Sequence, residues 1–150
     1  MKPTKSADKE TELLQDIYAN VKMGSESIMN IMPKVKDREM KAFMVTQLDQ
    51  YEKYASQAKK KLDEKGASAK EESAMTKMSA KMGMAMQTMM DSTTSHIAEM
   101  MVQGSTMDVT DLLQKVSAYS SYPECDDAIA FAKDIVDFEE KNVEKMKQFL

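Results

Sequence analysis

Residues 126–150, DDAIAFAKDIVDFEEKNVEKMKQFL, are the stretch that decides how this chain of 150 residues folds. Apolar side chains return there every three or four positions, a spacing that places them on one face of an α-helix. A helix with one apolar face buries that face against neighbouring helices. The stretch therefore predicts a helix of the protein core, with a carboxyl group on its inward side. The inward face consists of Ala128, Ala132, Val136, Glu139, Val143, Met146 and Leu150.

The same periodicity recurs upstream and predicts four further helices. They cover about residues 8–32, 37–64, 68–90 and 96–119. The short connections at 33–36 and 120–123 bring consecutive helices together as antiparallel hairpins. We therefore predict an all-α fold in one domain, 1–150: an antiparallel four-helix bundle of two hairpins joined by a methionine-rich crossover helix, five helices in total, with residues 1–7 as a flexible tail.

Local signals mark the ends of these predicted helices. Pro33 stops the first helix, and Gly66 is a typical residue just beyond the end of the second. The Ser-x-x-Glu pattern of a capping box occurs at 68–71 and at 121–124, which predicts the starts of the third and fifth helices. Pro123 is compatible with a first helical turn.

The composition favours helices and excludes several classes of protein. Gly and Pro together number 7 of 150 residues, too few for a fold rich in turns, and 42% of residues are hydrophobic. The 21 basic residues are outnumbered by 25 acidic ones, so no electrostatic footprint for nucleic acid is present. No apolar run approaches the roughly 18 residues that span a bilayer. We expect a cytoplasmic protein with neither a nucleic-acid nor a membrane partner.

Methionine is the main sulfur-containing residue of this chain, which has 17 Met residues and one Cys. In the predicted crossover helix the methionines form a narrow stripe, which predicts packing into the core; a groove for a partner is the alternative. A third hypothesis is copper handling, because Cu(I) favours thioether ligands. His96 and Cys125 are expected to be inert. The methionine stripe consists of Met75, Met78, Met82, Met86 and Met89.

Two carboxylic acids, Asp108 and Glu139, lie in the middle of apolar helical faces, where an unpartnered charge is costly. Antiparallel pairing through the 120–123 connection brings them near each other, with Asn142, Gln47 and Tyr51 as neighbours. One hypothesis is a metal site formed by Asp108, Glu139, Asn142 and Gln47, which suits Mg²⁺, Ca²⁺ or Mn²⁺ because histidine is missing. A variant of this hypothesis is that the two acids share one proton instead of holding a metal. The alternative is a polar cluster of the core, satisfied by Ser105, Tyr51, Gln47 and buried water.

In the number and spacing of its helices, the chain resembles the ferritin-like superfamily, and most of all its small bacterial families of unassigned function. The resemblance implies a four-helix bundle in which each hairpin supplies an inward Glu from its first helix and a Glu-x-x-His from its second. This chain departs from that pattern. The corresponding positions hold Asn20 and Gly24, Gln47-x-x-Gln50 or Glu52-x-x-Ala55, Asp108, and Glu139-x-x-Asn142.

These observations predict a binding protein rather than an enzyme, because no nucleophile is paired with a base. We expect the chain to act through a protein partner or through self-association of its helix faces, as a homo-oligomer, with no cofactor. The alternatives are a divalent metal at the Asp108/Glu139 site and the methionine-based handling of copper.

Overall fold

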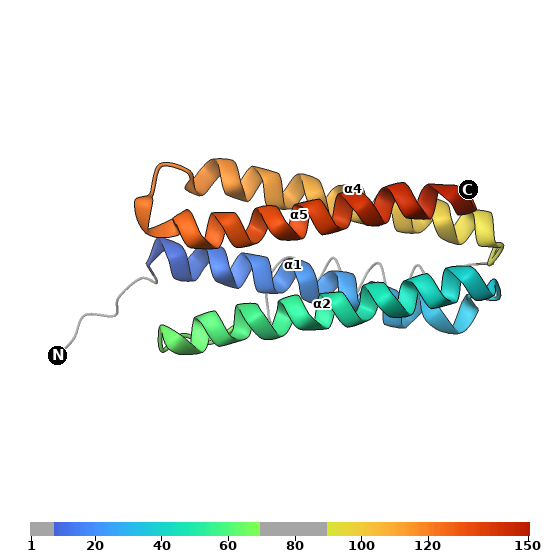
Figure 1. Cartoon of the computed structure of the whole chain (residues 1–150), viewed down its shortest axis with the longest axis horizontal. Helices are drawn as coiled ribbons and strands as arrows, with labels where there is room; N and C mark the ends of the chain where they lie inside the picture. The colour runs from blue at the N-terminus through green and yellow to red at the C-terminus, as the bar shows by residue number, and fades with distance from the viewer. Residues whose placement is uncertain (1–7, 70–89) are drawn as a thin grey trace.

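The computed structural model describes residues 8–69 and 90–150, and both ranges are helical without any strand (Figure 1). The predicted all-α class is confirmed for this part of the chain. Residues 70–89 of the predicted crossover helix, including its five methionines, lie outside the described residues. The long helices are α1 (Lys9–Ile31), α2 (Arg38–Glu64), α4 (Thr94–Tyr119) and α5 (Asp126–Met146). Single 3₁₀ turns follow α1 (Met32–Lys34), precede α5 (Pro123–Cys125) and follow α5 (Lys147–Phe149).

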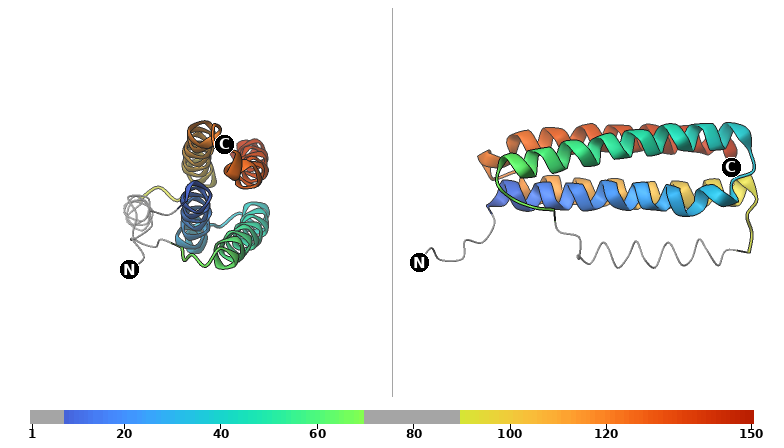
Figure 2. Two further views of the ribbon diagram at one scale, coloured as in Figure 1. Left: turned by 90° about the vertical axis from the view of Figure 1, so that its left-hand side faces the viewer. Right: turned by 90° about the horizontal axis from the view of Figure 1, so that it is seen from below.

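The four long helices lie lengthwise beside one another, and end-on they occupy the corners of a rough square (Figures 1 and 2). Helix α1 packs closely along α2, α4 packs closely along α5, and α1 also contacts α4. The α2–α5 side is the wider seam, because aromatic side chains rather than close backbone contacts fill it. None of the helices in the two described ranges is long and apolar enough to cross a membrane.

Short side-chain caps explain where three of the helices begin. The Oδ1 atom of Asp8 accepts a hydrogen bond from the Thr11 amide at 2.7 Å, and Asp37 accepts one from the Met40 amide at 2.8 Å. Thr93 caps α4 in the same way. These bonds satisfy amides that have no partner within the first helical turn.

The ends of α1 and α2 follow the predicted signals. Pro33 converts the end of α1 into a 3₁₀ turn. Gly66 has a φ of +69°, which permits the paired bonds from the Gly66 amide to Asp63 O and from the Ala67 amide to Leu62 O. This bonding pattern ends α2 at Glu64, shortly before the end of the first described range.

The predicted capping box at 121–124 is wrong. The first turn there is a 3₁₀ turn that begins at Pro123, with Tyr122 at its N-cap and no side-chain cap. The Cys125 amide instead bonds to the Tyr122 carbonyl oxygen at 2.9 Å, which tightens the turn before α5 starts. The α-helix also ends at Met146, and a 3₁₀ turn replaces its predicted final turn.

The core lies between the four helices and consists mainly of aliphatic side chains and methionines. Each helix buries most of the face that its periodicity predicts, and a polar layer interrupts the core near mid-length. The predicted inward position of Leu150 is wrong: it is 59% exposed, because the α-helix ends at Met146 and a 3₁₀ turn follows. The fully buried apolar residues include Leu13, Ile17 and Ile28 of α1, Met40, Met44 and Leu62 of α2, Ile97 and Leu112 of α4, and Ala132 and Ile135 of α5.

Candidate functional site: a buried acid pair and the groove between α2 and α5

Tyr51 is the centre of the polar layer in the core. Its hydroxyl donates a hydrogen bond to the Oε1 atom of Glu139 at 3.1 Å and so ties α2 to α5. The ring fits only because Gly24 of α1 has no side chain, since a Cβ atom there would lie 2.5 Å from the Tyr51 ring. The glycine in the apolar face of α1 therefore creates the space in which this layer forms.

Asp108 approaches the same layer from α4 and is 7% exposed. Beside it lies a small cavity of about 20 Å³, enough for one water molecule. Polar and thioether groups line the cavity, so a water there has hydrogen-bonding partners. The lining residues are Gly24, Ser27, Tyr51, Met100, Met101, Gly104, Ser105 and Asp108.

Burial favours the neutral form of both acids. It raises the pKa of Asp108 to about 8, and the negative charge of Asp111 adds to the rise. Burial also raises the pKa of Glu139 well above its usual range, helped by the charge of Asp108 and opposed by the hydrogen bond from Tyr51. Burial in turn raises the pKa of the Tyr51 hydroxyl. Burial therefore favours bound protons over negative charge in this layer.

Three buried polar atoms of α2 and α5 near this layer have no hydrogen-bond partner: Glu139 Oε2, Gln47 Oε1 and Asn142 Nδ2. Gln47 precedes Tyr51 by one turn of α2, and Asn142 follows Glu139 by one turn of α5. Since α2 and α5 run in opposite directions (Figure 1), both amides lie on the same side of the Tyr51–Glu139 bond. The polar layer thus has unused donors and acceptors on the side towards the C-terminus of α5.

The structure buries all four residues of the predicted metal site, Asp108, Glu139, Asn142 and Gln47, each at 7% exposure or less. Tyr51 and Ser105 join them, as their spacing predicts. Across residues 8–69 and 90–150, however, no group of three or more His, Cys, Asp or Glu side chains is placed to hold a metal ion. The role of these four residues as metal ligands stays a prediction.

Two other positions from the ferritin-like pattern lie outside this cluster. Glu52 is exposed and accepts a hydrogen bond from the buried Ser25 hydroxyl of α1. Asn20 is fully buried, and its Nδ2 atom donates to the backbone oxygen of Asp108 at 3.1 Å and to the Asp111 carboxylate at 3.4 Å. Asn20 therefore locks α1 to α4 through the backbone. Sequence reasoning missed Asp111, because it lies outside the apolar face of α4.

The lone cysteine and histidine do not join the acid pair. Cys125 is fully buried where α5 begins, and burial raises the pKa of its thiol, as do the charges of nearby acids. A thiol with a raised pKa is a poor nucleophile at neutral pH. His96 lies partly buried in the first turn of α4.

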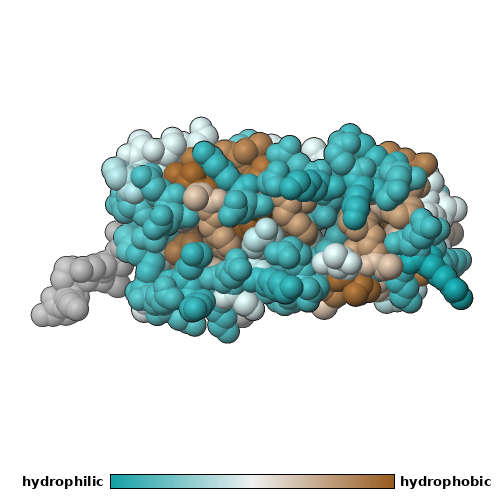
Figure 3. Space-filling view, viewed as in Figure 1, coloured by the Kyte–Doolittle hydropathy of each residue, from teal (hydrophilic) through white to brown (hydrophobic). Residues whose placement is uncertain are grey.

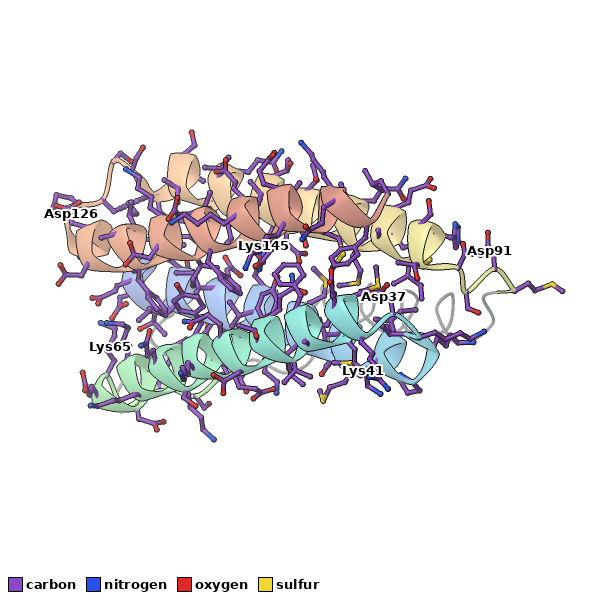
Figure 4. The ribbon with its side chains drawn as sticks, turned by 45° about the vertical axis from the view of Figure 1, so that its right-hand side comes forward. Asp37, Lys41, Lys65, Asp91, Asp126 and Lys145 are labelled. Carbon is purple, nitrogen blue, oxygen red and sulfur yellow. The ribbon has the colours of Figure 1, made fainter. Side chains whose placement is uncertain are left out.

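A surface groove follows the seam between α2 and α5 near the C-terminus. We call it the α2–α5 groove; its larger hollow measures about 740 Å³ and adjoins a smaller one of about 290 Å³. The ammonium of Lys145 lies 5.3 Å above the ring of Phe43, and Figure 4 shows Lys145 on α5. Apolar side chains interrupt the hydrophilic surface along this seam in Figure 3. The groove is lined by Phe43 and Thr46 of α2, Glu140, Lys141, Asn142, Glu144 and Lys145 of α5, and Gln148, with Glu39, Ala42 and Phe149 at the smaller hollow.

Comparison with known proteins gives no match: no family model, no curated protein and no solved structure corresponds to this chain.

Proposed function

We propose that this protein acts by binding another polypeptide at the α2–α5 groove rather than by catalysis. The observation that carries the proposal is the groove itself, in which Phe43 and Phe149 supply apolar surface between charged residues. Grooves between two helices accept a further helix through its apolar face, and a polar rim then sets its orientation. The polypeptide is either a second copy or a different protein.

We also infer that the four helices form a ferritin-like antiparallel bundle whose metal ligands are reduced to Asp108 and Glu139. Support for the inference comes from the pairing of α1 with α2 and of α4 with α5, and from the polar layer at mid-length. The expected cytoplasmic location and bacterial origin stay predictions. So does copper handling, because its methionines lie outside the described residues.

Site-specific photo-crosslinking tests binding at the groove. A photoreactive phenylalanine analogue replaces Phe43, and the same analogue at exposed Lys60 of α2 is the control. We expect one discrete polypeptide adduct at position 43, identified by mass spectrometry, that is lost on Lys145→Glu. Equal adduct formation at positions 43 and 60, or none at either, would refute the proposal.

A second candidate function is the binding of a divalent cation by the acid pair. The unpartnered Oε2 atom of Glu139 and Oε1 atom of Gln47 favour it, because both are oxygen donors of the kind that Mg²⁺, Ca²⁺ and Mn²⁺ prefer. A bound cation would hold Glu139 ionised, whereas the burial of Glu139 favours a bound proton.

Metal analysis of protein purified without chelator decides between the cation and the proton. Near-stoichiometric metal in the wild type that is lost in Glu139→Ala supports the cation site. Wild-type protein without metal, even after incubation with excess Mg²⁺, Ca²⁺ or Mn²⁺, refutes it.

A further inference from the structure

We propose that the occupant of the α2–α5 groove is a second copy of this chain, with its α5 antiparallel to the first α5 across a two-fold axis. This inference rests on the proposed function and specifies the partner. A symmetric dimer requires a surface that complements itself. When a second copy of the helix lies antiparallel to the first, residues of opposite charge must therefore face each other. The charges of α5 at the groove meet this condition.

The charge pattern of α5 at the groove is Glu140, Lys141, Glu144 and Lys145, and all four side chains are exposed. With the two-fold axis between positions 142 and 143, Glu140 faces Lys145 of the second copy, and Lys141 faces Glu144 of the second copy. The symmetry repeats both pairs, which gives four pairs of opposite charge. A parallel arrangement would instead place each residue against its own copy and oppose like charges.

The present partners of these residues do not prevent the rearrangement. Lys141 pairs with Asp137 on the same helix at 2.9 Å, and Glu144 pairs with Lys147 at 2.8 Å. All four side chains of these two pairs are at least half exposed, and such surface pairs contribute little to stability. Lys145 has a cation–π contact with Phe43, at 5.3 Å, which at a partly exposed site contributes about 0.5–1 kcal/mol. Pairing with a second copy therefore competes with these weak interactions.

Apolar surface next to the charges supplies the attraction that holds the two copies together. Phe43 lies next to Lys145, whose ammonium is 5.3 Å from its ring centroid, and Phe149 lines the adjoining hollow. Leu150 follows and is 59% exposed. In such an interface, the apolar centre provides affinity, whereas the charges at the rim set register and orientation.

A charge-exchange experiment on the full chain tests this arrangement by analytical ultracentrifugation. Variant A is Glu140→Lys with Glu144→Lys, and variant B is Lys141→Glu with Lys145→Glu. Each variant alone opposes like charges at all four pairs, so we expect at least about tenfold weaker self-association than in the wild type. In a mixture of A and B every pair again has opposite charges, and we expect association to return as an A–B dimer.

The matched control is Asp63→Lys with Glu64→Lys, which changes the net charge as variant A does but lies at the far end of α2. It should self-associate like the wild type and should not form a mixed dimer preferentially with variant B. Circular dichroism confirms that each variant folds.

The outcomes separate this inference from the proposed function. A wild type that is monomeric at every concentration overturns the self-association, while an adduct to a different protein at position 43 would still support binding at the groove. A wild-type dimer that neither variant weakens, or an A–B mixture that stays monomeric, overturns the antiparallel α5 arrangement.

Discussion

At the residue scale, the most consequential position is Gly24, whose missing side chain admits the Tyr51 ring into the core. In an exposed helix, alanine is more stable than glycine by about 1 kcal/mol. Here the steric conflict outweighs that gain, because an added Cβ atom would lie 2.5 Å from a ring carbon of a buried tyrosine.

We therefore predict that Gly24→Ala destabilises the protein by about 1–3 kcal/mol, as overpacking typically does. Urea unfolding followed by circular dichroism measures the change. In the background of Tyr51→Leu the ring is missing, so the same substitution should be neutral or stabilising. A similar loss in both backgrounds would show that the Tyr51 ring is not the cause.

Glu139 offers a second test at this scale, because its surroundings favour a neutral carboxyl group. We predict that Glu139→Gln changes the free energy of unfolding at pH 7 by less than about 1 kcal/mol, since the amide can accept the hydrogen bond from Tyr51. Glu139→Ala leaves a cavity and should cost about 2–4 kcal/mol.

Thermal melts with and without EDTA check this prediction. We expect the wild type and Glu139→Gln to be equally insensitive to the chelator. A wild type that EDTA destabilises, beside a Glu139→Gln variant that it does not, would favour the cation site instead.

At the element scale, the α2–α5 seam depends on aromatic rings. The ring of Phe138 lies edge-on to Tyr51 and Tyr54, with centroid distances of 5.1 and 5.4 Å. Lys61 covers Phe131 at the other end of the seam, at 5.2 Å. Because these rings fill the space between α2 and α5, removing one leaves a cavity in the seam.

We predict that Phe138→Ala lowers the free energy of unfolding by about 2 kcal/mol or more, because Phe138 is partly buried and contacts two rings. Val45→Ala, on the exposed side of α2, is the control and should cost far less. Chemical denaturation of both variants gives the comparison. Equal losses would mean that the rings do not hold α2 against α5.

At the scale of the whole molecule, the buried acids link global stability to pH. The pKa of Asp108 rises from 3.8 to about 8 on folding, so between these values the native state holds a proton that the unfolded state has lost. Stability that is present below about pH 4 therefore decreases as the pH rises towards 8, and Glu139 extends the decrease in the same direction.

We predict a fall in the free energy of unfolding of a few kcal/mol between about pH 4 and pH 9, because each pKa unit corresponds to about 1.4 kcal/mol. Asp108→Asn should reduce this slope, while Asp63→Asn at the exposed end of α2 should leave it unchanged. Urea unfolding at each pH provides the measurement. A slope that Asp108→Asn does not alter would place the proton linkage elsewhere.

The sequence alone determined the all-α class, the bounds of the four described helices to within a few residues, and the burial of Asp108 and Glu139. Helical periodicity, caps and proline act within a few residues of the chain, so their effects can be predicted locally. The start and end of α5 deviated from prediction because its first and last turns tighten into 3₁₀ geometry.

Only the tertiary structure decided which side chains of different helices contact one another. The fit of Tyr51 against Gly24, the bond from Tyr51 to Glu139 and the Asn20 contact to the Asp108 backbone join residues that are far apart in the chain. The α2–α5 groove likewise depends on how widely aromatic rings separate two helices. Such contacts follow from how whole helices are placed relative to one another. The volumes of side chains across the core determine this placement, and no local sequence pattern encodes it.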